Sequence, residues 1–159
     1  MALYRAVLRS TPKVAPKTPT VVGPSADVYN LDLEYYAGTR ILTFYGSVRS
    51  HAKFGKYNVQ VTFKNVKPHD GLTDEEIAQG FKPKPTLGEH EVQFRCGCLN
   101  YRFRFDKANR MHGVGTGARF GFYRRKSHRK PYNPKNLIGT CAHCQEFIDY
   151  LVRQGFVLQ

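Results

Sequence analysis

The chain has 159 residues, and 41% of them are hydrophobic, which is enough to bury a modest core and excludes a wholly disordered protein. Its longest apolar stretches, such as residues 41–45, are too short to span a bilayer, and the N-terminus lacks the apolar run of a secretory signal. We therefore expect a soluble protein made in a cytoplasm. A formal net charge of +13 predicts attraction to phosphates, anionic membranes or acidic protein surfaces.

Residues 1–27 are expected to form an extended N-terminal arm. Small residues separate its prolines and lysines, which include Pro12, Lys13, Pro16, Lys17, Pro19 and Pro24. Such a tract buries little surface and favours a conformation close to polyproline II. It is either a linker or tail, or an arm that becomes ordered by lying across a neighbouring subunit.

Residues 28–88 are predicted to form a small antiparallel β-sheet region. The β-forming segments are residues 28–33, 40–45 and 57–66, and in the last of these the apolar residues alternate with polar ones. This period-two pattern is typical of a sheet with one buried face.

A short helix is predicted after the third strand. Thr73 stands three residues before Glu76, a capping-box pattern that opens a helix to about Gln79, with Gly80 ending it. Pro83 and Pro85 then indicate a linker.

Residues 89–159 are predicted to form two strands and a helix. Residues 91–98 and 101–105 alternate aromatic or apolar with polar residues, which indicates a hairpin that turns near Leu99. Thr140 is a plausible N-cap for a later helix that ends before Gly155. Its apolar stripe consists of Phe147, Ile148, Leu151 and Val152. The whole chain is therefore expected to be an α+β protein.

Two clusters of metal-binding residue types lie in this last region. Cys96 and Cys98 fall near the predicted turn, and Cys141, His143 and Cys144 fall at the helix start. Thiolate and imidazole groups are preferred ligands of Zn²⁺, which binds four of them as a tetrahedron. The spacing permits either His143 or Cys144 as the fourth ligand. Two disulfides between the clusters are the alternative in an oxidised protein.

A basic, glycine-rich insertion separates the two ligand clusters. Its cations alternate with aromatic residues, an arrangement that suits either nucleic acid or a groove on a protein partner, and we favour protein. The candidate contact residues are Arg119, Arg124, Arg125, Lys126, Arg129 and Lys130.

The spacing of the ligands resembles that of the SWIM zinc finger, Cys-X-Cys followed by Cys-X-His, here Cys96, Cys98, Cys141 and His143. This resemblance favours His143 over Cys144 as a ligand. More narrowly, residues 94–105 and 133–143 are similar to SWIM-like structural proteins of tailed-bacteriophage virions. The resemblance implies a non-enzymatic virion component, in the tail or baseplate rather than the head, whose partners are other virion structural proteins in multiple copies. A nucleic-acid-binding SWIM protein is the alternative.

No residue pattern indicates an enzyme. The remaining histidines are scattered through polar segments and are not clustered with carboxylates: His51, His69, His90, His112 and His128. A catalytic zinc would also need an open coordination position, whereas this chain offers enough soft donors to close the shell.

Overall fold

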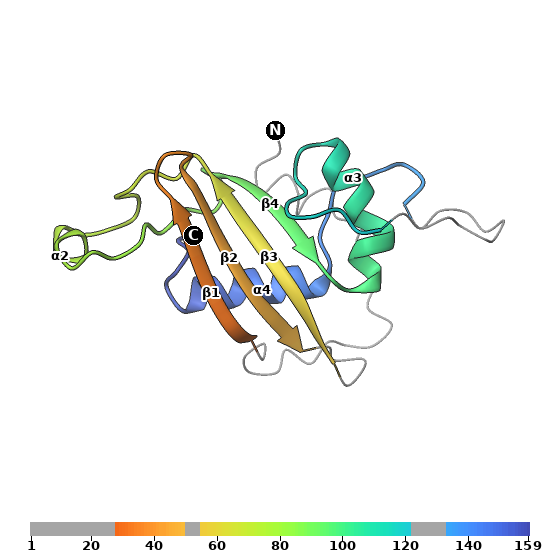
Figure 1. The fold of residues 1–159 in the computed structure, drawn as a ribbon, viewed down its shortest axis with the longest axis horizontal. Coiled ribbons are helices and arrows are strands. Elements are labelled where there is room, and N and C mark those ends of the chain that lie inside the picture. The colour runs from red at the N-terminus through yellow and green to blue at the C-terminus, as the bar shows by residue number, and fades with distance from the viewer. Residues whose placement is uncertain (1–27, 50–54, 122–132) are drawn as a thin grey trace.

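The computed structural model describes residues 28–49, 55–121 and 133–159, so the predicted arm lies outside the described residues. Within them, four strands form one antiparallel sheet in the order β1-β2-β3-β4, which are Val28–Tyr36, Ile41–Arg49, Lys56–Lys64 and Glu91–Cys96. The helix α4, Ala142–Arg153, lies across one face of this sheet (Figure 1). The predicted α+β class is confirmed.

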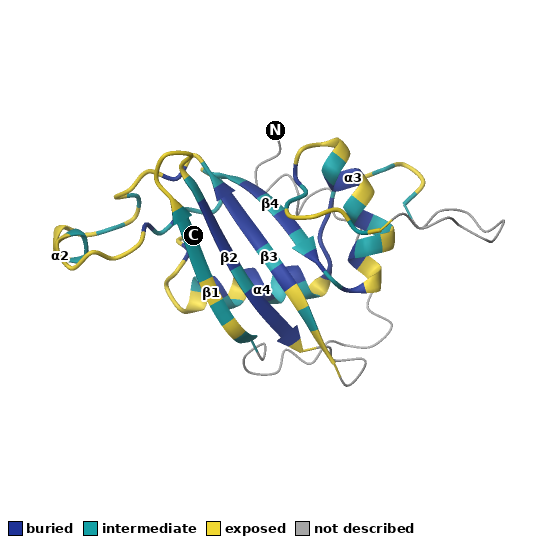
Figure 2. Ribbon diagram, viewed as in Figure 1, coloured by how far each residue is buried: buried dark blue, intermediate teal, exposed yellow. Residues whose placement is uncertain are grey.

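The alternation in the strands directs their apolar side chains toward α4. Figure 2 shows the result as a buried stripe along the middle strands. The stripe contains side chains that are at most 2% exposed: Leu42, Phe44, Val59, Val61 and Phe63. Phe147, Ile148 and Leu151 of α4 are fully buried against them. The sheet continues into β4, whose register places Cys96 opposite Val59. One shared core therefore supports the residues on both sides of the predicted boundary at residue 88.

One glycine permits the close approach of α4 to β2. A Cβ atom at Gly46 would lie 2.6 Å from Cε2 of Phe147, which is shorter than real carbon contacts. The Phe147 ring therefore occupies the space that a side chain at position 46 would need. This contact lets α4 approach β2 closely at Phe147.

The outer edge of β4 is covered by the segment that follows it. The Phe94 N–H donates to the Val114 carbonyl oxygen at 2.8 Å, and the Thr116 N–H donates to the Phe94 carbonyl oxygen at 3.2 Å. No described strand lies beside the outer edge of β1. The two edges of the sheet thus differ.

The predicted capping box is confirmed. Helix α2, Asp74–Ala78, has Thr73 as its N-cap, and the Thr73 hydroxyl and Glu76 carboxylate exchange hydrogen bonds with each other's backbone N–H groups. Gly80 ends this turn with a positive φ of 74°. None of the helices in the described segments is long and apolar enough to cross a membrane.

The predicted second strand of the hairpin is wrong. Tyr101–Phe105 forms a π-helical turn, η1, which continues into the helix α3, Asp106–Met111. Tyr101 and Phe105 are both buried, whereas Phe103 between them is 37% exposed. Burial therefore follows the i, i+4 spacing of a helical face and overrides the period-two alternation of aromatic residues with arginine. The expected strand-strand-helix unit is replaced by one strand, η1, α3 and α4.

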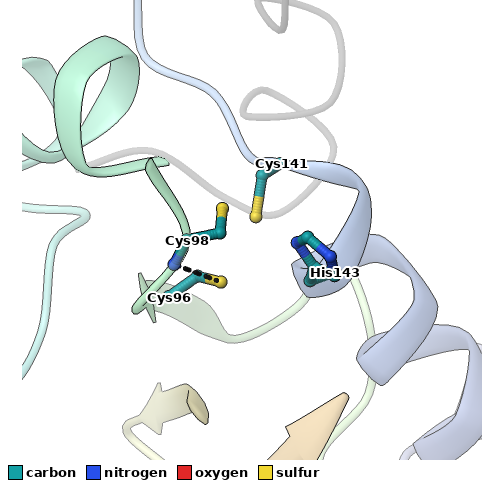
Figure 3. Close-up of side chains that lie close together, drawn as sticks. All are labelled: Cys96, Cys98, Cys141 and His143. Atoms are coloured by element: carbon teal, nitrogen blue, oxygen red, sulfur yellow. Dashed lines mark hydrogen bonds between the residues drawn. The ribbon is translucent and has the colours of Figure 1, made fainter. Parts of the chain in front are cut away.

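The predicted N-cap of the last helix is also wrong. Its N-cap is Cys141, whose backbone is extended (φ −92°, ψ 167°) and whose side chain makes no capping hydrogen bond. Thr140 is buried one residue earlier. The Cys141 sulfur instead points toward the other cysteines (Figure 3). The predicted end of the helix before Gly155 and the buried stripe of Phe147, Ile148 and Leu151 agree with the structure.

Candidate metal centre

Four of the predicted ligands meet at the junction between the sheet and α4 (Figure 3). Cys96 ends β4 and Cys98 follows it, while Cys141 caps α4 and His143 lies in the first turn of that helix. Their ligand atoms all lie within 4.8 Å of one another. Ligand atoms around a tetrahedral zinc stand about 3.8 Å apart when its bonds to sulfur are about 2.3 Å. A small inward movement of the side chains would therefore bring all four into coordination.

Backbone hydrogen bonds hold the two sulfurs of the first ligand pair. The Cys98 N–H donates to the Cys96 sulfur at 3.5 Å, and the Tyr101 N–H donates to the Cys98 sulfur at 3.3 Å. The Gly97 N–H donates to the Asn58 carbonyl oxygen at 2.9 Å, which ties the residue between the cysteines to β3. These donors stabilise negative charge on the sulfurs, as a metal-bound thiolate requires.

Asn109 of α3 holds the second ligand segment against the first. Its side-chain amide donates to the Gly139 carbonyl oxygen at 2.8 Å and accepts from the Gly139 N–H at 3.0 Å. The same amide donates to the Tyr101 hydroxyl at 3.2 Å. Asn109 is fully buried, so these bonds satisfy a polar group that would otherwise destabilise the core.

Asn109 was not among the residues that the sequence singled out. It falls within the insertion that was expected to be basic and glycine-rich, and α3 has no apolar periodicity that marks one face. An asparagine between Ala108 and Arg110 carries no local sign of burial. The side-chain amide of Asn109 connects the two ligand segments only because α3 lies beside residues 139–141.

The rival ligand Cys144 lies beside this set of four but outside it. Its sulfur is 3.7 Å from that of Cys141, and its side chain is fully buried in the apolar core with Phe147 and Ile148. All four cysteines are free thiols. The structure therefore places His143 in the group of four and Cys144 next to this group, where it contacts Cys141 and Cys96.

Burial of the sulfurs of Cys96 and Cys144 opposes the loss of their protons. The contact with Cys141 acts to lower the pKa of the Cys96 thiol, but contacts with Cys144 and Cys98, together with burial, raise that pKa well above its ordinary value. Burial also raises the pKa of Cys144. Cys96 therefore has to lose its proton when a metal ion binds at the site.

His143 faces the same sulfurs. Burial acts to lower its pKa, but hydrogen bonds and charge interactions with Cys96 and Cys98 outweigh burial and raise the pKa to about 10. Its Nδ1 atom is buried and has no hydrogen-bond partner, and its ring lies 4.9 Å from the ring of Tyr57, centroid to centroid. An imidazole with an unsatisfied buried nitrogen beside three sulfurs fits a tetrahedral metal ion such as Zn²⁺.

Of the predicted basic contact residues, the structure describes Arg119, which is exposed on the segment after α3. The other five, Arg124, Arg125, Lys126, Arg129 and Lys130, lie outside the described residues. The structure adds two arginines that were not predicted: the guanidinium carbons of Arg95 and Arg102 lie 4.4 and 5.4 Å from the centre of the Phe120 ring. Arg95 comes from β4 and Arg102 from η1, so no spacing in the sequence relates them.

Comparisons of the chain with protein-family models, with curated proteins and with solved structures find no match. The site is a cluster of three buried thiols and one partly buried imidazole that can hold a metal ion.

Proposed function

We propose that Cys96, Cys98, Cys141 and His143 hold one structural Zn²⁺ that fastens the end of β4 to the start of α4. The observation that supports this best is the closed set of four soft donors, three of them buried, within 4.8 Å of one another. Four protein ligands fill a tetrahedral shell, so no coordination position is left for a substrate. The ion when bound supplies a cross-link between segments that are far apart in the chain.

The protein that is fastened in this way is proposed to be a non-enzymatic structural component of a tailed-phage virion, with the tail or baseplate favoured. The support is the resemblance of residues 94–105 and 133–143 to SWIM-like virion proteins, together with a site whose shell is closed to substrates. In this role the protein is proposed to hold neighbouring virion subunits together through its N-terminal arm and its basic insertion, and its net charge of +13 favours acidic neighbours.

Native mass spectrometry tests the metal site. The purified chain is measured with and without a chelator, beside the variants His143→Ala and Cys144→Ser. We expect one zinc per chain, lost on replacing His143 and kept on replacing Cys144. Zinc that is lost with Cys144 and kept without His143 would assign the four-cysteine site instead. A metal-free protein whose mass is lower by four hydrogens would show two disulfides and contradict the proposal.

Purified particles test the role in the virion. The protein is expected to sediment with intact particles through a density gradient in a fixed ratio to the other structural proteins. Its recovery only in the soluble fraction of lysed host cells, with particles free of it, would contradict the virion role and leave the metal site unaffected.

A second candidate function is nucleic-acid binding, because Arg95 and Arg102 both contact Phe120 and neither forms an ion pair with a described carboxylate. Cations beside an aromatic ring are typical of single-strand binding surfaces. Fluorescence anisotropy with a labelled oligothymidylate at increasing salt checks this. Affinity that falls steeply with salt would support it, since phosphate contacts release counterions. Absent or salt-independent binding would exclude it.

A further inference from the structure

A hollow lies on the surface directly after the first pair of ligands. It has a volume of about 340 Å³, and the described residues that line it are Leu99, Asn100, Phe103 and Arg104. Leu99 is 57% exposed and Phe103 is 37% exposed, so two large apolar side chains face solvent at the same place. Exposed Leu and Phe around a hollow are typical of a site where a partner inserts an apolar side chain.

One arginine lines this hollow and a second lies beside its aromatic wall. Arg104 lines it, and the guanidinium carbon of Arg102 lies 5.8 Å from the centre of the Phe103 ring. The Nε atoms of both arginines are buried without a hydrogen-bond partner, and neither guanidinium pairs with a carboxylate of any described residue. By contrast, Arg110 on the neighbouring helix pairs with Asp106 at 3.0 Å. Positive charge at the hollow is therefore left without a counter-charge by the described chain.

From this arrangement we infer that the hollow binds an acidic segment of a neighbouring protein, which inserts one aromatic or large aliphatic side chain between Leu99 and Phe103. The carboxylates of the segment lie against Arg102 and Arg104. The inference rests on the proposed function, because it names the kind of partner that the structural protein holds. A concave apolar site suits one inserted side chain, whereas a nucleic-acid strand needs open aromatic faces along a groove.

The residues that line this hollow are connected directly to the candidate metal site. The Arg102 N–H donates to the Cys98 carbonyl oxygen at 3.0 Å, and the Tyr101 N–H donates to the Cys98 sulfur. Leu99 and Asn100 are thus the connection between a proposed zinc ligand and η1. A bound metal would hold this connection in one conformation before the partner arrives, which lowers the entropy cost of binding.

Three capped five-residue peptides test the inference on the full chain by two-dimensional NMR. The first has phenylalanine between two acidic residues on each side, the second replaces phenylalanine by alanine, and the third replaces the acids by their amides. The first peptide is expected to shift the backbone signals of residues 98–105 and to bind about tenfold more tightly than either of the others. No shift in residues 98–105, or equal binding of the alanine peptide, would overturn the inference.

Variants connect the binding to the named side chains. Leu99→Glu and Arg104→Gln are each expected to weaken the acidic phenylalanine peptide about tenfold, because they remove the apolar wall and a cation respectively. Lys82→Gln removes one exposed positive charge outside the hollow and is the matched control, expected to bind like the native chain. An equal loss in Lys82→Gln would show that only net charge matters and would contradict the site.

Three further outcomes distinguish peptide binding at the hollow from the nucleic-acid and virion roles. Oligothymidylate that shifts the same signals and displaces the peptide would assign the surface to nucleic acid and overturn the inference. A protein that sediments with particles but binds none of the peptides would keep the proposed function and overturn only the hollow. Peptide binding by a protein that is absent from particles would keep the binding site at the hollow and overturn the proposed virion role.

Discussion

The middle of the sheet and the junction that carries the ligands are held together in different ways. β2 and β3 pair without interruption from Ile41 opposite Lys64 to Arg49 opposite Lys56, above a continuous apolar core. At the junction, a few polar side chains draw together segments that are far apart in sequence: the four donors and the amide of Asn109. Many weak contacts stabilise the middle of the sheet, whereas a few single residues stabilise the junction. Substitutions should therefore act differently in the two regions.

The largest effect is expected from removal of the metal. Cys98→Ser, or treatment with a chelator, should lower the free energy of unfolding by several kcal/mol, with an upper limit of about 10 kcal/mol. The reason is that structural zinc binding supplies folding free energy. Hydrogen exchange measured by mass spectrometry is expected to lose protection in residues 98–111 and 139–146 while residues 41–48 and 57–64 stay protected. Met111→Ala, at a side chain that is 62% exposed, is the control. Equal loss of protection in both regions would mean that the junction is not a separate unit of stability.

Phe147→Ala should destabilise both regions together. The ring packs over Gly46 and is fully buried, and removal of such a side chain costs about 3–5 kcal/mol. Urea unfolding followed by circular dichroism measures the change, and the zinc content of the folded variant should equal that of the native chain. Met111→Ala, at a side chain that is 62% exposed, should cost less than about 0.5 kcal/mol. A lower zinc content in Phe147→Ala would show that the core also sets the ligand geometry.

Asn109→Ala should act on the junction alone. It leaves the N–H and carbonyl groups of Gly139 without their partners, which costs about 1–3 kcal/mol. Competition with a zinc-binding dye is expected to show weaker zinc binding, because residues 139–141 lose their support. Asn100→Ala, at an exposed position, is the control. Unchanged zinc affinity would mean that Asn109 supports the fold without positioning Cys141.

The smallest effect is expected at α2, remote from both regions. Thr73→Ala removes the N-cap and should cost about 1 kcal/mol, visible as faster hydrogen exchange in residues 74–80. Hydrogen bonds from Lys84 and from the Thr73 backbone lower the pKa of Glu76. The stability that Glu76 contributes is therefore present above its unfolded pKa and is lost as the pH falls through its lower folded pKa. The protection factors of this segment, which are corrected for the intrinsic pH dependence of amide exchange, should fall in acid, and Glu76→Gln should remove that fall.

The features that could be predicted from the sequence also differ between the sheet and the junction. Alternation along Tyr57, Val59, Val61 and Phe63 identified β3, because Val59, Val61 and Phe63 are buried on one face and Tyr57 is partly buried. The same rule failed at Tyr101–Phe105, where alternating residues fold as a helical turn since the Tyr101 hydroxyl reaches the Phe94 carbonyl oxygen. The meeting of the two ligand clusters was predictable from the chemistry of their side chains. The role of Asn109 was not, because it depends on where α3 lies.

The difference between the two sheet edges limits how copies of the chain can associate. Backbone groups of residues 114 and 116 occupy the centre of the outer edge of β4, while no described strand pairs with the outer edge of β1. In the described part of the chain, the outer edge of β1 is therefore the edge that can accept a further strand, from another copy or another protein. Two copies that pair through their β1 edges both use up that edge, and the β4 edge of each is already bonded at Phe94. In such a pair, continued edge-to-edge growth would have to displace residues 114 and 116.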